Sequence, residues 1–377
     1  MSVVVPFSRP YVPSRSRELL GVSLESSHLS GDGPMTGRAI ELLNHICGTA
    51  SILLTPSCTH ALELACRLVG LQPGDEVIIP SFNFPSAATA VTLCGATPVF
   101  VDVDLATKNI SATAFAKEIT ERTRAVIVLH YAGVSADIMR IADVARSAGL
   151  AIIEDVAHGL GVRTDGPILG SVGDFATYSF HETKNVQCGE GGALQINDLS
   201  FMDRAEVLRD KGTNRKQFHR GLVDKYSWVD IGSSWLLADP LAAVLCGQLE
   251  MYGEIQRQRR ATWTSYFDGL SGHSLPAGFM LPHSPVDQEN AAHMFYLIAP
   301  SLEARSRFIE HLSSRGVSSA FHYQPLHSSI AGKRFGRTGD CSNSIELGDR
   351  LVRLPLYAGM LEDDLSTVLE AVYSFEA

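Results

Sequence analysis

Lys184 has the sequence surroundings of a reactive lysine. It stands in SFHETKNVQCGEGG (179–192), where an apolar strand is expected to end near Phe180 and a polar turn and a glycine-rich segment follow. A lysine condenses with an aldehyde only when its amine is neutral, and burial lowers the pKa of the amine toward that state. Most lysines are solvated, so a solvated turn lysine is the competing interpretation that this context leaves open.

Asp155 and His158 lie at and just beyond the end of another apolar run, LAIIEDV (150–156). A carboxylate at the end of a buried strand can pair with the protonated nitrogen of a pyridine ring, which keeps such a ring an electron sink. His158 can hydrogen-bond an oxygen on the same ring. The alternatives are a helix-capping or turn aspartate and a packed or solvated histidine.

The segment TPSCTHAL (55–62) indicates an anion site. A strand is expected to run into Ser57, Cys58 and Thr59 and a helix to follow, so backbone N–H groups and hydroxyls would face a phosphate. Ser179 can add another hydroxyl. The alternative is that Ser57 or Thr59 simply caps the helix.

An aromatic side chain in PSFNFPS (80–86) can lie flat on a planar ring, and both Phe84 and Phe82 come just past an expected strand. Either one can equally be a core aromatic. Each signal is weak alone, but together they form an ordered set: phosphate site, ring-stacking aromatic, carboxylate and lysine, all at strand ends. This set predicts an enzyme that binds pyridoxal 5′-phosphate (PLP) through Lys184.

Two kinds of element alternate through the middle of the chain and must position these residues. Short apolar runs are expected to be strands, at 76–80, 97–104, 124–130, 150–156 and 175–180. Stretches with helical spacing lie between them, at 59–70, 111–121 and 135–149. Apolar strands that alternate with helices predict a mostly parallel α/β sheet covered on both faces, and such sheets bind ligands at the carboxyl ends of their strands.

The pattern changes near residue 240, and we expect two domains. Residues 238–270 read as one long helix or two close ones, and the strands and helices that follow are typical of a small α+β domain. The predicted division is a large α/β domain with an N-terminal arm at 1–245 and a small domain at 246–377.

Composition excludes several other classes of protein. The formal net charge of −10 makes a nucleic-acid-binding surface unexpected. The seven cysteines show no metal-ligand spacing, so no metal is expected, and they suit a reducing compartment better than a disulfide framework. No signal peptide or membrane-spanning run is apparent, so we expect a cytoplasmic protein without a membrane partner. No G-x-G-x-x-G follows the first strand, which argues against a Rossmann oxidoreductase.

Motifs along nearly the whole chain resemble the sugar aminotransferases of the DegT/DnrJ/EryC1/StrS family. SFHETKN with GEGG is typical of the family, and KGTNR with DIGSS is similar to its 4-aminotransferase branch. The resemblance implies a PLP-dependent transferase of fold type I that forms a homodimer with active sites at the interface. It also implies that L-glutamate aminates the nucleotide sugar dTDP-4-keto-6-deoxyglucose to dTDP-4-amino-4,6-dideoxygalactose.

The resemblance further implies a role for each cofactor residue. Lys184 would hold the cofactor and move a proton between Cα of the donor and C4′ of the cofactor. Asp155 would pair with the pyridine nitrogen. The other implied contacts are His158 with the phenolate oxygen, Phe84 with the ring face, and Cys58, Thr59 and Ser179 with the phosphate.

Residues outside this set would complete the site from the partner subunit. Many relatives have an asparagine near the position of Ser234, where it reaches a phosphate across the dimer, and here Ser234 or an ordered water would replace it. Arg215 and Lys225 would face the partner's site, where the basic segment KGTNRKQFHR would meet the nucleotide diphosphate. A solvated helix face is the alternative for this segment.

The motif FHYQPLH holds ring side chains that would contact the sugar or the base, namely His322, Tyr323 and His327. A structural turn rich in rings is the alternative. Three other functions also need weighing. A 3-amino or other-nucleotide sugar aminotransferase differs only in small pocket details that one sequence does not expose. A PLP-dependent dehydratase would have histidine in place of Lys184, and a non-catalytic regulator would not need the intact set of lysine, carboxylate and aromatic.

Overall fold

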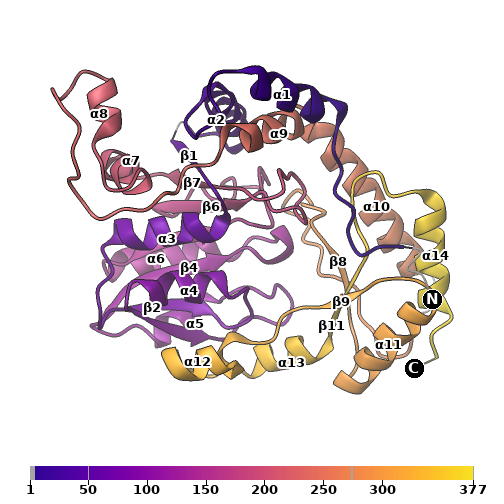
Figure 1. The fold of residues 1–377 in the computed structure, drawn as a ribbon. Helices are drawn as coiled ribbons and strands as arrows, with labels where there is room; N and C mark the ends of the chain where they lie inside the picture. The colour runs from indigo at the N-terminus through magenta and orange to yellow at the C-terminus, as the bar shows by residue number, and fades with distance from the viewer. Residues whose placement is uncertain (1–4, 50, 273–274, 377) are drawn as a thin grey trace.

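An eight-stranded sheet forms the centre of the molecule (Figure 1). The structure is a computed structural model and describes residues 5–49, 51–272 and 275–376. The strands follow one another across the sheet in the order β1-β7-β6-β5-β4-β2-β3-β10. Their bounds are β1 (Ile52–Thr55), β2 (Glu76–Pro80), β3 (Thr97–Val101), β4 (Thr123–Leu129), β5 (Ala151–Asp155), β6 (Phe175–Ser179), β7 (Gly192–Ile196) and β10 (Arg337–Thr338).

The sheet is mostly parallel, which confirms the prediction. The five apolar runs expected to be strands form β2 to β6, and these strands pair in parallel. β7 differs, because it pairs antiparallel with both β6 and β1. The chain passes from β6 to β7 through residues 180–191 without a crossover helix, and such a direct return requires antiparallel pairing. Lys184 lies in this connection.

Helices cover both faces of the sheet, because its strands carry apolar side chains on both. Along β2, Val77 and Ile79 pack into one core cluster and Ile78, which points the other way, packs into another. The helices on the first face are α3 (Cys58–Val69), α4 (Ser86–Leu93) and α7 (Met202–Arg209). Those on the second face are α2 (Pro34–Cys47), α5 (Ala112–Lys117), α6 (Ile138–Ser147) and α9 (Asp239–Glu250).

A small antiparallel sheet of order β8-β11-β9 lies toward the C-terminus. Together with its helices it forms the α+β arrangement expected there, around a core that includes Phe295, Phe308 and Val352. The strands are β8 (Phe295–Ile298), β9 (Ala320–Phe321) and β11 (Leu351–Leu354). The helices in this core are α10 (Tyr252–Gly272), α11 (Leu302–Ser314) and α14 (Glu362–Tyr373). Two more helices, α12 (Ile330–Phe335) and α13 (Ser342–Arg350), come before β11 in the chain.

Contacts cross the predicted domain boundary in several places. The boundary between residues 245 and 246 lies inside α9, and β10, which comes from beyond it, pairs with β3 of the large sheet. Near the other end of the chain, Val5 forms a parallel bridge with Val317. Residues 238–270 form the two close helices α9 and α10, one of the two arrangements expected. The division at residue 245 therefore stays a prediction.

Two further segments complete the fold. Helix α1 (Ser14–Glu25) packs along α9. Residues 202–234, here called the arm, contain α7 and the short helix α8 (Arg215–His219), and the α8 end projects away from the body of the molecule (Figure 1). Within the described residues, no helix has the length and apolar character that crossing a membrane would need.

Candidate active site

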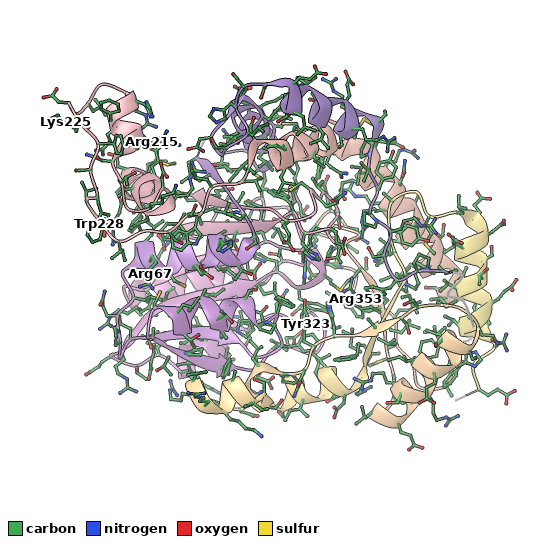
Figure 2. The ribbon with its side chains drawn as sticks, viewed as in Figure 1. Arg67, Arg215, Lys225, Trp228, Tyr323 and Arg353 are labelled. Atoms are coloured by element: carbon green, nitrogen blue, oxygen red, sulfur yellow. The ribbon has the colours of Figure 1, made fainter. Side chains whose placement is uncertain are left out.

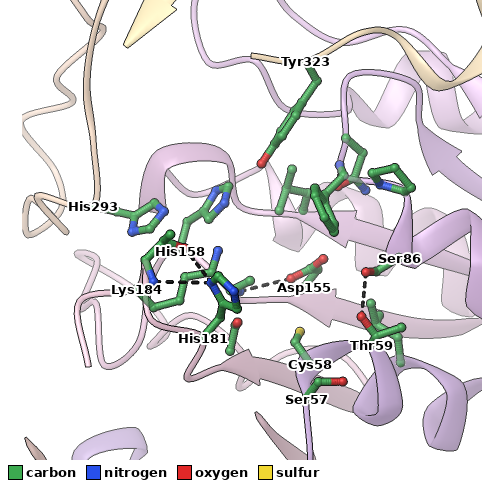
Figure 3. A pocket seen from close by; sticks show the side chains of 18 of the residues that line it. Ser57, Cys58, Thr59, Ser86, Asp155, His158, His181, Lys184, His293 and Tyr323 are labelled. Atoms are coloured by element: carbon green, nitrogen blue, oxygen red, sulfur yellow. Dashed lines mark hydrogen bonds between the residues drawn. The ribbon is translucent and has the colours of Figure 1, made fainter. Parts of the chain in front are cut away.

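A cavity of about 560 Å³ opens where several strands of the large sheet end, and residues of the small sheet close its other side (Figure 3). This is the position that the carboxyl-end rule predicts for a parallel sheet. Most of the site residues proposed from the sequence line this one cavity. They are Cys58, Thr59, Phe84, Asp155, His158, Ser179, Lys184, His322 and Tyr323.

Lys184 is half-buried in the connection between β6 and β7, and its amine lines the cavity. Its backbone N–H donates to the His181 carbonyl at 2.9 Å, which closes a tight turn just after β6. Burial lowers the pKa of the Lys184 amine to about 8, although Cys58 and Asp155 act to raise it. Roughly a tenth of such an amine is neutral at pH 7. Lys184 is therefore not a solvated turn lysine, and it can attack an aldehyde.

Asp155 ends β5 and is only 6% exposed. One carboxylate oxygen accepts a hydrogen bond from the Ala157 N–H at 3.1 Å, and burial raises the pKa of the carboxyl while the nearby Lys184 opposes that rise. A single backbone donor meets only a small part of the hydrogen-bonding capacity of a buried carboxylate. The side chain is thus suited to a cationic group of a ligand in the cavity.

His158 lies against the cavity as one of two stacked imidazoles. Its ring is 4.4 Å from that of His293, at an interplanar angle of 17°. Burial lowers the pKa of both side chains well below the usual range, so both are neutral. Because Nδ1 of His158 accepts from the Ala132 N–H at 3.2 Å, its proton is on Nε2. His158 can therefore donate one hydrogen bond from Nε2.

The first turn of α3 faces the cavity. Ser57 and Thr59, the two residues that could cap this helix, have different hydrogen-bond partners. Ser57 is the N-cap, and its hydroxyl accepts from the His60 N–H at 3.2 Å. Thr59 does not cap, because its hydroxyl bonds the Ser86 hydroxyl at 2.7 Å. Ser179 also lines the cavity, and it pairs with Gly192, which lies against Ser57 and Cys58. Backbone N–H groups of a helix start with three nearby hydroxyls form a suitable site for a phosphate.

Cys58 opens α3, and Gly192 of β7 lies against the backbone of Ser57 and Cys58. Burial raises the pKa of the Cys58 thiol far above its usual range, so the thiol is not a reactive thiolate. Gly192 passes so close that a Cβ on it would lie 2.3 Å from the Ser57 carbonyl carbon. The last glycine of GEGG, Gly192, thus allows β7 to pack against the start of α3.

Phe84 and Phe82 have different environments, which decides between the two candidates for stacking. Phe82 is 0% exposed and its ring packs among Tyr131 and Tyr323. Phe84 is 58% exposed and lines the cavity. Only Phe84 therefore has a ring face free to lie on a ligand.

The small sheet contributes polar rings to the far side of the cavity. His322 and Tyr323 stack on each other with ring centroids 3.8 Å apart, and both line the cavity. His327 does not line it, because its imidazole bonds the Ser81 hydroxyl at 2.6 Å. Of the three ring side chains in FHYQPLH, two therefore line the cavity and the third bonds a strand-end serine.

Several lining residues were missed by reading the sequence, among them His293 and Arg353. The motif AHMFY contains His293, but no local pattern connects it with a strand end of the large sheet. Arg353 gave a usable signal, because it interrupts the otherwise apolar run LVRLPL, and a charged residue in a buried strand needs a reason. Glu190 was missed as well, whereas Asn83, Ser86 and His181 lie in strand-end segments where chemistry was expected, although no role was given to them.

Ser234, Arg215 and Lys225 lie outside the cavity of their own chain. All three are exposed and belong to the arm, where Figure 2 shows Arg215 and Lys225 near its tip. Ser234 pairs with Asp210 through a backbone bridge. Their predicted roles concern a partner subunit's site and stay predictions.

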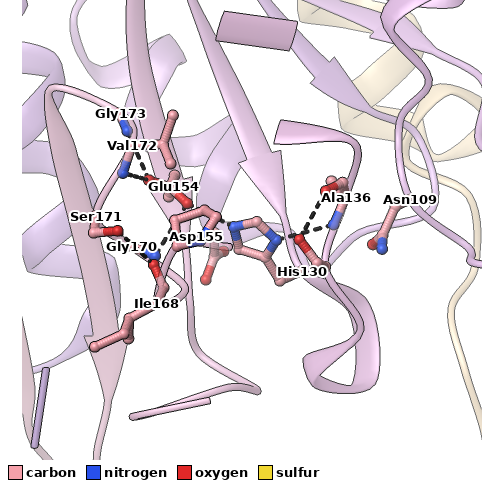
Figure 4. Close-up of polar contacts among 12 residues, drawn as sticks. Asn109, His130, Ala136, Glu154, Asp155, Ile168, Gly170, Ser171, Val172 and Gly173 are labelled. Carbon is pink, nitrogen blue, oxygen red and sulfur yellow. Dashed lines mark hydrogen bonds and ion pairs between the residues drawn. The ribbon is translucent and has the colours of Figure 1, made fainter. Parts of the chain in front are cut away.

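Glu154 and His130 form a fully buried pair directly beside Asp155 (Figure 4). Nε2 of His130 donates to Glu154 at 2.9 Å, because its Nδ1 already accepts from the Ala136 N–H. The two carboxylate oxygens also accept from three backbone N–H groups, of Gly170, Val172 and Gly173. Burial opposes the charge of Glu154, but these donors outweigh burial and lower its pKa. The network fixes the end of β5.

Replacing Glu154 with glutamine should lower the free energy of unfolding by about 3 kcal/mol at pH 7. In glutamine an NH₂ group replaces one carboxylate oxygen. It would face backbone N–H groups that now donate to that oxygen, so donors would meet donors. Folding lowers the pKa of Glu154. The carboxylate therefore contributes to the free energy of unfolding above its unfolded pKa, and this contribution is lost as pH falls through the folded pKa. The difference in free energy of unfolding between variant and wild type should therefore become smaller at acidic pH.

Urea denaturation followed by circular dichroism checks this, with the exposed Glu121→Gln as the matched control. Equal stability of Glu154→Gln and the control at pH 7 would show that the network contributes nothing.

Comparison with known proteins identifies the family to which this chain belongs. The model of the DegT/DnrJ/EryC1/StrS aminotransferase family matches residues 14–373. The chain belongs to this family. It is 31% identical over 377 residues to the spore coat polysaccharide biosynthesis protein SpsC of Bacillus subtilis, covering 98% of this chain and 96% of that protein.

Solved structures agree with this assignment. The aminotransferase TlmJ from Streptoalloteichus hindustanus superposes with a TM-score of 0.90 at 29% identity, over 98% of both chains. The PLP form of the putative sugar aminotransferase Spr1654 from Streptococcus pneumoniae superposes with a TM-score of 0.89 at 26% identity, over 98% of this chain and 97% of that one. The fold is thus that of the fold type I PLP enzymes, and the chain is a PLP-dependent aminotransferase of a sugar aminotransferase family.

The residues in the cavity fit PLP as the cofactor. The start of α3 with its hydroxyls suits the phosphate, and the exposed face of Phe84 suits the ring. Asp155, which makes no ion pair within the described residues, suits the protonated pyridine nitrogen. Lys184 supplies an amine whose lowered pKa suits reaction with the aldehyde.

Proposed function

We propose that this enzyme transfers the amino group of L-glutamate to C4 of dTDP-4-keto-6-deoxyglucose, giving dTDP-4-amino-4,6-dideoxygalactose and 2-oxoglutarate. The observation that carries the reaction class is the convergence of Lys184 and Asp155 on one cavity at the ends of neighbouring strands. The choice of sugar is supported by the segments KGTNR and DIGSS, which are similar to the 4-aminotransferase branch of the family.

Lys184 is the proposed acid and base of both half-reactions. PLP, when bound, supplies an aldehyde carbon that takes up the amino group and a ring that accepts the electrons of the bond broken at the donor Cα. The neutral Lys184 amine removes the proton from the donor Cα, because its lowered pKa leaves it able to accept a proton near neutral pH. In the second half-reaction the protonated amine returns a proton to C4 of the sugar.

The remaining cavity residues are proposed to hold and orient the cofactor. We assign the phosphate to Ser179, Thr59 and the backbone N–H of Cys58, and the ring nitrogen to Asp155. His158 would donate from Nε2 to the ring oxygen, and its neutral state means that it adds no competing charge beside Lys184.

His322 and Tyr323 are the proposed sugar contacts on the small-sheet side. Their stacked rings present a flat surface and a phenol hydroxyl to the cavity. Burial lowers the pKa of His322 to about 2, so it acts as a neutral polar group. Neutral polar rings suit a hexose, which carries hydroxyls and no charge.

The arm is proposed to complete the active site of a second subunit in a homodimer. It exposes large apolar side chains together with basic ones, which is typical of a surface that another chain covers. Trp228 is 79% exposed and Leu222 is 69% exposed. In such a dimer Arg215 and Lys225 would meet the nucleotide diphosphate, and Ser234 the cofactor phosphate.

A single half-reaction tests the proposed substrate. Enzyme loaded with pyridoxamine phosphate is mixed with dTDP-4-keto-6-deoxyglucose, and the absorbance of the PLP form is followed while the sugar is isolated. We expect the PLP absorbance to return and NMR to identify a 4-amino-4,6-dideoxy sugar of galacto configuration.

The contrary results separate the parts of the proposal. If glutamate converts the PLP form but the keto sugar does not restore it, the substrate assignment is wrong and the aminotransferase stands. A 3-keto sugar or a UDP-linked sugar then becomes the next compound to try. If glutamate also fails, the donor assignment is wrong.

A further inference from the structure

His293 presents an unused ring nitrogen to the cavity. Its side chain is only 4% exposed, lines the cavity and stacks on His158 (Figure 3). Nδ1 lies 2.9 Å from Oδ1 of Asn185, whereas Nε2 has no hydrogen-bond partner within the described structure. Nε2 is not among the described polar atoms that are both unpartnered and closed off from solvent. This nitrogen is therefore accessible from the cavity.

Asn185, the neighbour of Lys184 in the chain, decides which nitrogen of His293 carries the proton. Nδ2 of Asn185 donates to the Gln256 side chain at 2.8 Å and to the Ala291 carbonyl at 2.7 Å. Because a carbonyl can only accept, the amide must be oriented so that its oxygen faces His293. An amide oxygen also only accepts, so the imidazole proton is on Nδ1. Burial lowers the pKa of His293 well below the usual range, and Nε2 is therefore an unprotonated acceptor.

The other histidines that line the cavity offer no such nitrogen. Nδ1 of His158 and Nδ1 of His181 each accept from a backbone N–H, so the proton of each ring is on Nε2. Both nitrogens of His322 already have hydrogen-bond partners. Among the cavity histidines that the structure describes, His293 is thus the one with an acceptor nitrogen left for a ligand.

The chemistry of the reactants indicates which donor this nitrogen serves. The ring of bound PLP brings one N–H, on the pyridine nitrogen, and that group is assigned to Asp155. L-glutamate brings carboxylates, which only accept, and an amino group, which is the group transferred. Lys184 lines the same cavity but forms no hydrogen bond to His293 within the described structure. The keto sugar is the reactant that brings hydroxyl donors.

We propose that Nε2 of His293 accepts a hydrogen bond from the C3 hydroxyl of the keto sugar, which is the hydroxyl next to the carbon that receives the amine. His293 stacks on His158, which is assigned to the oxygen of the cofactor ring, so its nitrogen lies on the side of the cavity where the amine is transferred. The other hydroxyl of the hexose, at C2, is one carbon farther from C4. The inference rests on the proposed function, in which the substrate is a 4-keto hexose.

The two half-reactions separate this contact from a general role of His293. His293→Phe keeps a ring that can stack on His158 and removes the acceptor. Its pyridoxamine phosphate form should react with dTDP-4-keto-6-deoxyglucose about 30-fold more slowly than wild type, because a buried hydroxyl loses its partner. The reaction of its PLP form with glutamate should change less than about threefold. His293→Gln, whose side-chain oxygen can take the place of Nε2, should recover most of the sugar reaction.

The 3-deoxy analogue of the keto sugar tests which hydroxyl is bound. Wild-type enzyme should react with it about 30-fold more slowly than with the parent sugar. In His293→Phe the difference between the two sugars should fall below about threefold, since both changes remove the same hydrogen bond. The control is His45→Phe, which replaces an exposed histidine at the end of α2 and should behave as wild type with both sugars.

Nuclear magnetic resonance of the cofactor-free enzyme tests the acceptor itself, without turnover. In protein labelled with ¹⁵N-histidine, two-bond ¹⁵N–¹H correlations distinguish the two neutral forms of each imidazole. The signals that are missing from His293→Gln belong to His293, and we expect a neutral ring with its proton on Nδ1. This measurement does not depend on the folding of His293→Phe.

Four results would overturn the proposal. They are a proton on Nε2 of His293, a wild-type enzyme that does not distinguish the 3-deoxy analogue, equal losses in the two half-reactions of His293→Phe, and a 3-deoxy penalty that persists in that variant. If wild-type enzyme does not react with the keto sugar while glutamate still converts its PLP form, the proposed substrate is wrong, and the contact proposed here falls with it.

Discussion

Lys184→Ala should lower kcat of transamination by about 10⁴-fold or more. The variant loses the amine that holds the cofactor and also the base that removes the donor Cα proton, and proton transfer by a positioned group alone contributes about 10²–10⁴-fold. The fold should survive, because Lys184 lies in a connection and its side chain makes no hydrogen bond that stabilises a helix or strand in the described structure.

Borohydride reduction provides the direct measurement. In wild-type enzyme it should fix the cofactor to the chain, and peptide mass spectrometry should find the added mass on Lys184. Lys117→Ala, an exposed lysine at the end of α5, is the control and should keep both labelling and activity. Labelling that persists on another lysine in Lys184→Ala, with activity retained, would contradict the central assignment.

Asp155→Ala should lower kcat by about 10²–10³-fold, the second largest effect expected. A preorganised charge opposite a developing one in a buried site is worth this much in other enzymes, and without it the pyridine nitrogen loses its proton and the ring its capacity to take up electrons. Asp155 is suited to this task because it is buried and its carboxylate accepts only one hydrogen bond within the described structure.

Three variants separate charge from shape at this position. Asp155→Glu keeps the charge and should retain more activity than Asp155→Asn, which keeps the shape. Asp165→Asn, on an exposed turn, is the control and should behave as wild type. Steady-state kcat and the absorbance of bound PLP should be followed together. If Asp155→Asn is as active as Asp155→Glu, the ring nitrogen does not depend on this carboxylate.

Much of this architecture follows from local patterns. Strands buried on both faces are apolar throughout, so the runs at β2 and β5 could be located within a residue or two. Chemistry collects at the carboxyl ends of parallel strands. Asp155 could therefore be identified from one-dimensional information, because its place in the site is set by where its own strand ends.

The small sheet's share of the site could not be read in that way. His293 and Arg353 reach the cavity only because β8 and β11 pair with each other and pack against the large sheet. Both residues lie more than a hundred positions from Lys184 in the sequence. A hydrophobic pattern within one segment cannot predict contacts over such a separation. The antiparallel β7 was missed for a similar reason, since a strand's direction depends on the connection it follows.

The sequence by itself determined the fold class and predicted the reactive lysine with its carboxylate and ring-stacking aromatic, because residue types at strand ends and shared family motifs carry that information without distances. Only the tertiary structure decided which residue of each close pair does which task. Phe84 lines the cavity while Phe82 is 0% exposed, and Ser57 caps α3 while Thr59 does not. The physical reason is that burial and hydrogen-bond partners are properties of the packed chain, and neighbours in sequence can differ in both.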